Sequence, residues 1–157
     1  MSNYATHTRF NLTVALPLCS ALFYLYITDS LSHLLCFGAA FVWGTFFLNP
    51  DLDLVHQVKL FSLRGLLTAP LRWYPWLFKH RGLSHHFFLG TLSRVLCLGL
   101  ISSLALYLVD HTGKLHRSFW ILCYANKAYL ACGLGGLFLA DIAHLFQDIL
   151  PRKRGRR

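Results

Sequence analysis

The sequence contains no glutamate, and all six of its acidic residues are aspartates. Charged residues of both signs make up only 13% of the 157 residues, whereas 55% are hydrophobic. Soluble globular domains ordinarily carry about 25% charged residues, so this composition argues against one, with an unusually apolar soluble helical bundle as the alternative. The length suits a single domain, which we expect to cover residues 1–157.

The five cysteines are scattered, and no two of them form a Cys-x-x-Cys pair. This pattern argues against a zinc-thiolate site and against a disulfide framework. We expect the five thiols to behave as small apolar side chains inside helices. Cysteine is therefore not expected to carry the chemistry of this protein.

The sequence does have long apolar runs, at residues 10–28, 31–49, 86–109 and 128–149. Each run is close to the roughly 20 residues that a helix needs to cross the hydrocarbon core of a membrane. Backbone polar groups in lipid must be satisfied within their own segment, so the runs are predicted to be helices. The predicted fold class is all-α: a multi-pass membrane bundle of about four transmembrane helices, with an interfacial cytoplasmic segment at 50–85.

The net charge of +9 is distributed unevenly along the chain. Ten of the 15 basic residues lie in the 50–85 segment or in the tail 151–157, and none lies between the first two apolar runs. The positive-inside rule then places both termini and the 50–85 segment in the cytoplasm. The basic tail could instead bind nucleic acid, but no basic aromatic surface accompanies it elsewhere, so no nucleic-acid partner is expected.

Ligand-type side chains gather in four clusters beside these apolar runs. Imidazole nitrogens and carboxylate oxygens are the ligands that divalent transition metals use. In the predicted topology all four clusters lie at cytoplasmic helix ends, and helices packed about 8–10 Å apart can bring such side chains together. Up to four carboxylates with neutral imidazoles would suit one or two divalent ions. The clusters are His7; Asp51 and Asp53; His80, His85 and His86; and Asp141, His144 and Asp148.

In this order, the motifs resemble an uncharacterised family of metal-binding bacterial membrane proteins, over nearly the whole chain. That family is similar in motif to the YdjM-type membrane-bound metal-dependent hydrolases, and more distantly to the all-helical zinc-dependent phospholipase C and P1-nuclease group. The motifs are Thr6-His7, Pro50-Asp51-Leu52-Asp53, His80-Arg81-Gly82-Leu83-Ser84-His85 and His144-x3-Asp148, with Arg64, Arg72-Trp73 and Gly90-Thr91 with Arg94 also in place.

The resemblance implies a protein of the bacterial plasma membrane that binds one or two divalent ions, with zinc foremost and manganese or another metal as alternatives. The ligands it implies are His7, Asp51, Asp53, His80, His85, His144 and Asp148. Two positions depart from the family pattern. His86 replaces a Ser or Gly, which leaves it as an extra ligand or an idle side chain, and Asn49 replaces a Gly in a turn. Asp141 is a further candidate ligand.

Two classes of function fit such a site. In a metal-dependent hydrolase acting on a lipid or another phosphoester or ester at the cytoplasmic face, Arg81 would bind the phosphate, with Arg64 or Arg72 as substitutes. Asp53 or Asp51 would act as general base or as ligand, which the sequence does not separate. The alternative is a non-catalytic protein that stores, senses or is stabilised by the metal. Transport is less favoured, because transporter sites lie mid-membrane.

Three further features lie near the predicted site or inside the helices. His56 follows Asp53 by three residues and is a candidate to join the site. Arg94 lies eight residues after His86, about 12 Å deeper along a helix, and we expect its side chain to snorkel towards the cytoplasm. The glycines at 133, 135 and 136 predict a close helix-packing surface rather than a phosphate loop.

Overall fold

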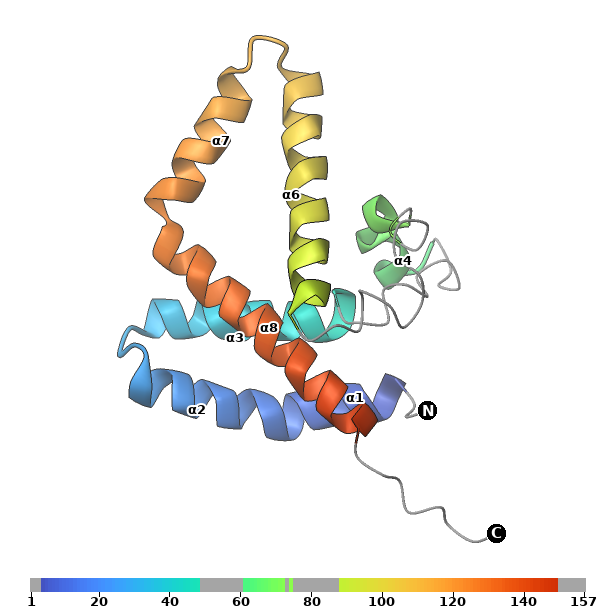
Figure 1. Cartoon of the computed structure of the whole chain (residues 1–157), viewed down its shortest axis with the longest axis vertical. Helices are drawn as coiled ribbons and strands as arrows, with labels where there is room; N and C mark the ends of the chain where they lie inside the picture. Colours follow the sequence, from blue (N-terminus) through green and yellow to red (C-terminus); the bar gives the residue numbers. More distant parts are fainter. Residues whose placement is uncertain (1–3, 49–60, 73, 75–87, 150–157) are drawn as a thin grey trace, which may run out of the picture.

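The computed structural model describes residues 4–48, 61–72, 74 and 88–149, and within these ranges the chain is helical, without a strand (Figure 1). The predicted all-α class is confirmed for this part of the chain. The elements are α1 (Tyr4–Phe10), the π-helix η1 (Asn11–Ala15), α2 (Leu16–Tyr26), α3 (Leu31–Phe47), α4 (Leu63–Leu67), the 3-10 helix η3 (Ala69–Leu71), α6 (Leu89–Val109), α7 (Lys114–Ala125) and α8 (Lys127–Ile149).

The first helical run begins earlier than the apolar pattern indicated. Residues 4–26 form one continuous run of α1, η1 and α2, whereas the sequence predicted a helix over 10–28. His7 therefore lies inside a helix and not ahead of it, because no glycine or proline interrupts residues 4–10. The predicted 31–49 and 128–149 helices agree with α3 and α8 to within two residues.

Three helices are long and apolar enough to cross a membrane: Thr6–Tyr26, Leu89–Val109 and Lys127–Ile149. The helix at Leu31–Phe47 is also apolar, but it is shorter, with 17 residues. The described part of the chain thus contains three helices of full spanning length where the sequence suggested about four. The difference arises because α3 ends at Phe47, before the Asn49-Pro50 pair that disfavours further helix.

A π-helical turn interrupts the first run between α1 and α2. The N–H of Leu16 donates to the Asn11 carbonyl, a hydrogen bond five residues back along the chain. Pro17 follows at once and has no N–H to donate to the carbonyl of Thr13, which loosens the regular α-helical ladder at this place. The hydroxyl of Thr13 donates to the Arg9 carbonyl oxygen at 2.8 Å. Such turns are often found near functional sites.

Among the described helices, α3 and α8 make the most extensive contact, with α2 beside α3 (Figure 1). A Cβ atom on Gly136 would lie only 2.3 Å from the carbonyl oxygen of Phe37, so no larger residue fits there. Phe37 and Phe41 are fully buried at this contact, together with Ala140. The predicted glycine packing surface therefore exists at Gly136, which allows the two backbones to approach closely.

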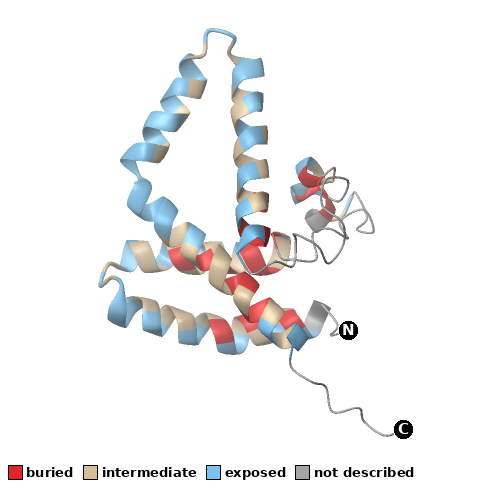
Figure 2. Cartoon of the chain, viewed as in Figure 1, coloured by how far each residue is buried: buried red, intermediate tan, exposed pale blue. Residues whose placement is uncertain are grey.

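Helices α6 and α7 form a hairpin that extends away from the rest of the chain (Figure 1). Buried residues gather where α1, α3 and α8 meet, around α4 and η3, and at the first turns of α6, whereas the rest of α6 is intermediate or exposed and most of α7 is exposed (Figure 2). In the view of Figure 1, α6 rises steeply from α3 and does not run parallel to it. The described helices thus differ from the predicted bundle of adjacent helices, since α6 contacts the others at its first turns and is buried only at Gly90, Thr91 and Arg94.

Candidate metal centre

Two histidines and an aspartate come together where α1 meets the end of α8. One ligand atom from each of His7, His144 and Asp148 lies within 4.8 Å of the other two. His7 Nε2 is 3.4 Å from Asp148 Oδ1, and His144 Nε2 is 3.8 Å from Asp148 Oδ2. The four-residue spacing places both α8 side chains on one face of the helix, and that face meets α1.

The two imidazoles are buried, whereas the carboxylate reaches the surface. The side chains of His7 and His144 are each 3% exposed, and that of Asp148 is 36% exposed. The two rings stack with centroids 4.2 Å apart. His7 Nδ1 is buried without a hydrogen-bond partner among the described residues, and such a polar atom is costly to bury.

These three residues fit a divalent transition metal ion. Two nitrogens and one carboxylate oxygen form a donor set typical of zinc and related ions. Ligand atoms that share one ion at about 2.1 Å each can be at most about 4.2 Å apart, so a small side-chain movement would place all three on one ion. The unpartnered Nδ1 of His7 also shows that protein groups do not use the full bonding capacity of this imidazole among the described residues.

A hydrogen-bond network holds His7's helix against α8. The amide of Asn11, one turn after His7, donates to the carbonyl oxygen of Ala140 at 3.1 Å and to Thr45 Oγ1 at 3.3 Å. Its own oxygen accepts a hydrogen bond from Gln147 Nε2 at 3.1 Å. Asn11 is only 1% exposed, so both its donors and its acceptor are used inside the protein.

Asn11 and its partners Thr45 and Gln147 were not predicted from the sequence. The available signal was weak: an amide within an apolar stretch, one turn beyond a predicted ligand. Nothing in the local sequence of Asn11 identifies its partners, which lie 34 and 136 residues away. Buried polar side chains of this kind are almost always hydrogen-bonded. The burial of Asn11, which the local sequence does not reveal, is therefore what indicates that it has partners.

Of the seven predicted metal ligands, the structure describes three, and it brings these three together. The other four lie outside the described residues, as do Arg81, predicted to bind phosphate, and the candidate ligands His86 and His56. The four undescribed ligands are Asp51, Asp53, His80 and His85.

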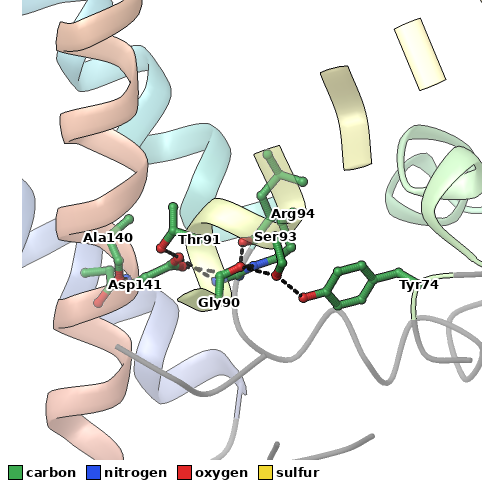
Figure 3. Close-up of polar contacts among 9 residues, drawn as sticks. Tyr74, Gly90, Thr91, Ser93, Arg94, Ala140 and Asp141 are labelled. Atoms are coloured by element: carbon green, nitrogen blue, oxygen red, sulfur yellow. Dashed lines mark hydrogen bonds and ion pairs between the residues drawn. The ribbon is translucent and has the colours of Figure 1, made fainter. Parts of the chain in front are cut away.

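Asp141, a further candidate ligand, makes other contacts. Its carboxylate pairs with Arg94, with 2.6 Å between Arg94 Nη2 and Asp141 Oδ2, and accepts a hydrogen bond from Thr91 Oγ1 at 2.5 Å (Figure 3). The prediction that Arg94 snorkels towards the cytoplasm is wrong, since Arg94 is only 2% exposed. The buried carboxylate of Asp141, on another helix, is the partner of the guanidinium in place of water.

The described part of the chain is all-α, and its helices bring two stacked imidazoles and a carboxylate together. These side chains are a donor set of the kind that binds metal ions. Residues 3–157 match the family described as "Uncharacterized metal-binding protein (DUF2227)". The chain belongs to this family, which confirms the metal-binding family that the motifs indicated.

One curated relative is an uncharacterized protein of Aquifex aeolicus (strain VF5), 48% identical over 64 residues. The match covers 40% of this chain and 43% of that protein, so it spans less than half of the relative's length. No solved structure matches the chain.

Proposed function

We propose that this protein is an integral membrane protein that binds a divalent cation at the cytoplasmic face and uses it to hydrolyse a phosphoester or another ester. The observation that carries the proposal is the meeting of His7 with His144 and Asp148, residues that lie at opposite ends of the sequence. Membership of a metal-binding family supports the cation, and the resemblance to membrane-bound hydrolases supports the reaction.

The exposed surface of α6 supports placement in a membrane. Leu96, Leu100 and Leu104 follow one stripe of this helix and are 62%, 68% and 57% exposed. Burying a leucine side chain from water gains roughly 1.5–3 kcal/mol, so a soluble protein would be expected to cover such a stripe. Hydrocarbon around α6 removes this cost, and the helix has the length that a membrane requires.

The proposed orientation follows from the basic residues. The start of α1 and the end of α8 carry the site, and the tail 151–157 with its five basic residues follows directly. Basic residues near helix ends favour the cytoplasmic side. The site then faces the cytoplasm, and both termini lie on that side.

The chain's own residues have distinct proposed roles. His7 and His144 would hold the cation from its buried side, and Asp148 would hold it from the exposed side, where a substrate can approach. We propose Asp51, Asp53, His80 and His85 as further ligands, with one of the two aspartates as general base. A bound divalent ion would lower the pKa of a water molecule and polarise an ester group.

Arg81 is the residue we propose to bind the substrate's phosphate, because a guanidinium forms paired hydrogen bonds with phosphate oxygens. It lies between His80 and His85 in the sequence, so the same segment would supply both metal ligands and the anion-binding group. Zinc is the cation that we propose, with manganese as the alternative.

A non-catalytic metal protein is the second candidate, and the burial of the imidazoles favours it. With His7 and His144 each 3% exposed, Asp148 is the one of the three described ligands that a substrate can reach. Structural metal sites have closed coordination shells, whereas catalytic sites keep an open position. Metal that is bound stoichiometrically without any turnover would favour this candidate.

Elemental analysis of the detergent-purified protein tests the cation. We expect stoichiometric zinc or manganese in the wild type, and a metal content at least tenfold lower in His144→Ala and His7→Ala. His33→Ala is the matched control, since His33 contacts Thr28 and Tyr129 and not this cluster. Metal content that is equal in all four proteins would reject the site.

A turnover assay tests the reaction. Metal-loaded protein in bilayers would be offered soluble phosphodiesters, phospholipids and carboxylic esters, before and after chelation. We expect hydrolysis of at least one class, lost on chelation and restored by zinc or manganese. Stable metal binding with no turnover of any class would exclude the hydrolase from those substrates and support the non-catalytic alternative.

A further inference from the structure

A single guanidinium, that of Arg94, connects α6, α8 and the residue that follows α3; Figure 3 shows it near Asp141. Its Nη2 pairs with Asp141 on α8 at 2.6 Å, and its Nη1 donates to the carbonyl oxygen of Leu48 directly after α3. Its Nε donates to the carbonyl oxygen of Gly90, in the first turn of its own helix α6, at 2.9 Å. The guanidinium thus interacts with three separate parts of the chain at the same time.

Each of these contacts adjoins a group of proposed metal ligands. Leu48 lies three residues before Asp51, and Gly90 lies five residues after His85. On α8, Asp141 lies three residues before His144, on the same face of the helix. Arg94 therefore contacts three positions that are near proposed ligands in the sequence, and one of these ligands, His144, lies within the described part of the chain.

Asp141 is held in a defined orientation within this arrangement. Thr91 Oγ1 donates to Asp141 Oδ2 at 2.5 Å, and Arg94 Nη1 lies 3.4 Å from Oδ1. Both charged residues are 2% exposed. A buried ion pair contributes little to stability compared with apolar residues of the same volume, so stability alone is a weak reason for this pair.

We propose that Arg94 is a positioning residue for the metal centre, which ties the end of α3 and the start of α6 to α8 beside His144. This proposal rests on the proposed metal site. The planar guanidinium suits the task because its five donors are held in a rigid fork. A lysine can keep the charge beside Asp141 but cannot reach the Leu48 and Gly90 carbonyls in the same geometry.

The first experiment compares Arg94→Lys with Arg117→Lys, an exposed position on α7. Each protein is titrated with Co²⁺ and Zn²⁺, and the visible spectrum of bound Co²⁺ reports the ligand geometry. We expect Arg94→Lys to bind 10- to 100-fold more weakly, as is usual when residues behind metal ligands are changed, with an altered Co²⁺ spectrum. Arg117→Lys should match the wild type, and wild-type affinity and spectrum in Arg94→Lys would overturn the proposal.

A double variant separates positioning from stability. Arg94→Met alone leaves a buried carboxylate without its cation, and unfolding would then explain any loss of metal. In Arg94→Met/Asp141→Leu both charges are gone, so we expect cooperative unfolding near the wild-type temperature together with weakened Co²⁺ binding and an altered spectrum. A double variant that keeps both its stability and its wild-type metal site would contradict the role of Arg94.

Amide hydrogen exchange gives a readout that does not depend on metal. In metal-free protein we expect faster exchange at residues 45–48 and 89–92 in Arg94→Lys than in the wild type, and no change in Arg117→Lys. Unchanged exchange would overturn the connection between the segments even if metal binding fell. If the wild type bound no Co²⁺ or Zn²⁺, the proposed metal function would fail while exchange still decided whether Arg94 holds these segments.

Discussion

Asn11 shows how much a single buried polar residue can decide. It lies in the π-helical turn after α1 and hydrogen-bonds to α3 and α8, so it aligns the helix that carries His7 with the helix that carries His144. A metal site needs its ligands held to within a fraction of an ångström. The amide of Asn11 supplies this alignment from one turn away.

Replacing Asn11 by alanine should weaken both the fold and the metal site. The change leaves the Ala140 carbonyl and the Gln147 amide each short of one buried partner, which costs about 1–3 kcal/mol, and we expect lower metal affinity as well. Thermal unfolding and Zn²⁺ titration in detergent measure the two effects. Asn126→Ala is the control, since that amide makes an exposed hydrogen bond within its own turn, and equal behaviour of the two variants would contradict the role of Asn11.

At the scale of elements, the contact between α3 and α8 is the most extensive one among the described helices. It places the ligand-bearing end of α8 beside α1, and the closest approach depends on the missing side chain at Gly136. The glycine at 133 lies one turn earlier on the same helix, yet a Cβ there would make only ordinary contacts, at 3.8 Å from Ala40 Cβ. Space for a methyl group therefore exists at Gly133 but not at Gly136.

Gly136→Ala is expected to be destabilising by at least about 2 kcal/mol, because the added methyl overlaps backbone atoms of Phe37 that cannot move aside. Gly133→Ala is the matched control and should be neutral or stabilising by up to about 1 kcal/mol, since alanine favours helix over glycine. Chemical denaturation of both variants measures the difference. A Gly136→Ala protein as stable as Gly133→Ala would show that α3 and α8 do not pack this closely.

The turn between α6 and α7 has a pH dependence of predictable sign. Hydrogen bonds hold the pKa of the Asp110 carboxyl below its usual value. The largest effect comes from the hydroxyl of Thr112, and the next largest from the backbone N–H of Leu115. A lowered folded-state pKa gives stability that is present at neutral pH and is lost as the pH falls through that pKa. The turn itself depends on Gly113, whose φ of 72° suits glycine.

We expect the amides of Thr112 and Leu115 to be better protected from hydrogen exchange in the wild type than in Asp110→Asn at pH 7. The two proteins should converge at pH values below the ordinary aspartate pKa of about 3.9, as the wild-type carboxyl becomes neutral. Asp29→Asn, in the exposed turn between α2 and α3, is the control. Equal protection at pH 7 would contradict this role of Asp110.

At the scale of the whole molecule, two helices that are far apart in the sequence, α1 and α8, meet. The start of α1 and the last turns of α8 form the candidate metal centre, while the α6–α7 hairpin extends away from it (Figure 1). If these helices span a membrane, the site and the hairpin turn lie on opposite sides. The basic tail then marks the side of the site.

A reporter fused after Arg157 is expected to read cytoplasmic, and one inserted after Gly113 is expected to read on the other side of the membrane. The expectation follows from the five basic residues in 151–157 and from the full spanning length of both α6 and α8. Paired alkaline phosphatase and fluorescent protein fusions measure it. Two cytoplasmic readings, or an outer reading after Arg157, would contradict the proposed topology.

The sequence by itself determined the helical class, the approximate bounds of α3 and α8, and the kinds of ligand available. Apolar runs of spanning length and the i, i+4 spacing of His144 and Asp148 are local patterns, and local geometry converts them directly into structure. Charge distribution predicted that His7 would share a face with these two residues, although it gave no distances.

Only the tertiary structure decided how the polar residues are paired. Asp141 and His144 look equivalent in the sequence, yet the first faces Arg94, 47 residues away, while the second stacks on His7. Gly133 and Gly136 likewise differ only in what α3 places against them. Helical periodicity specifies which side chains share a face, but the neighbour of that face depends on how distant helices pack, and no local pattern contains that information.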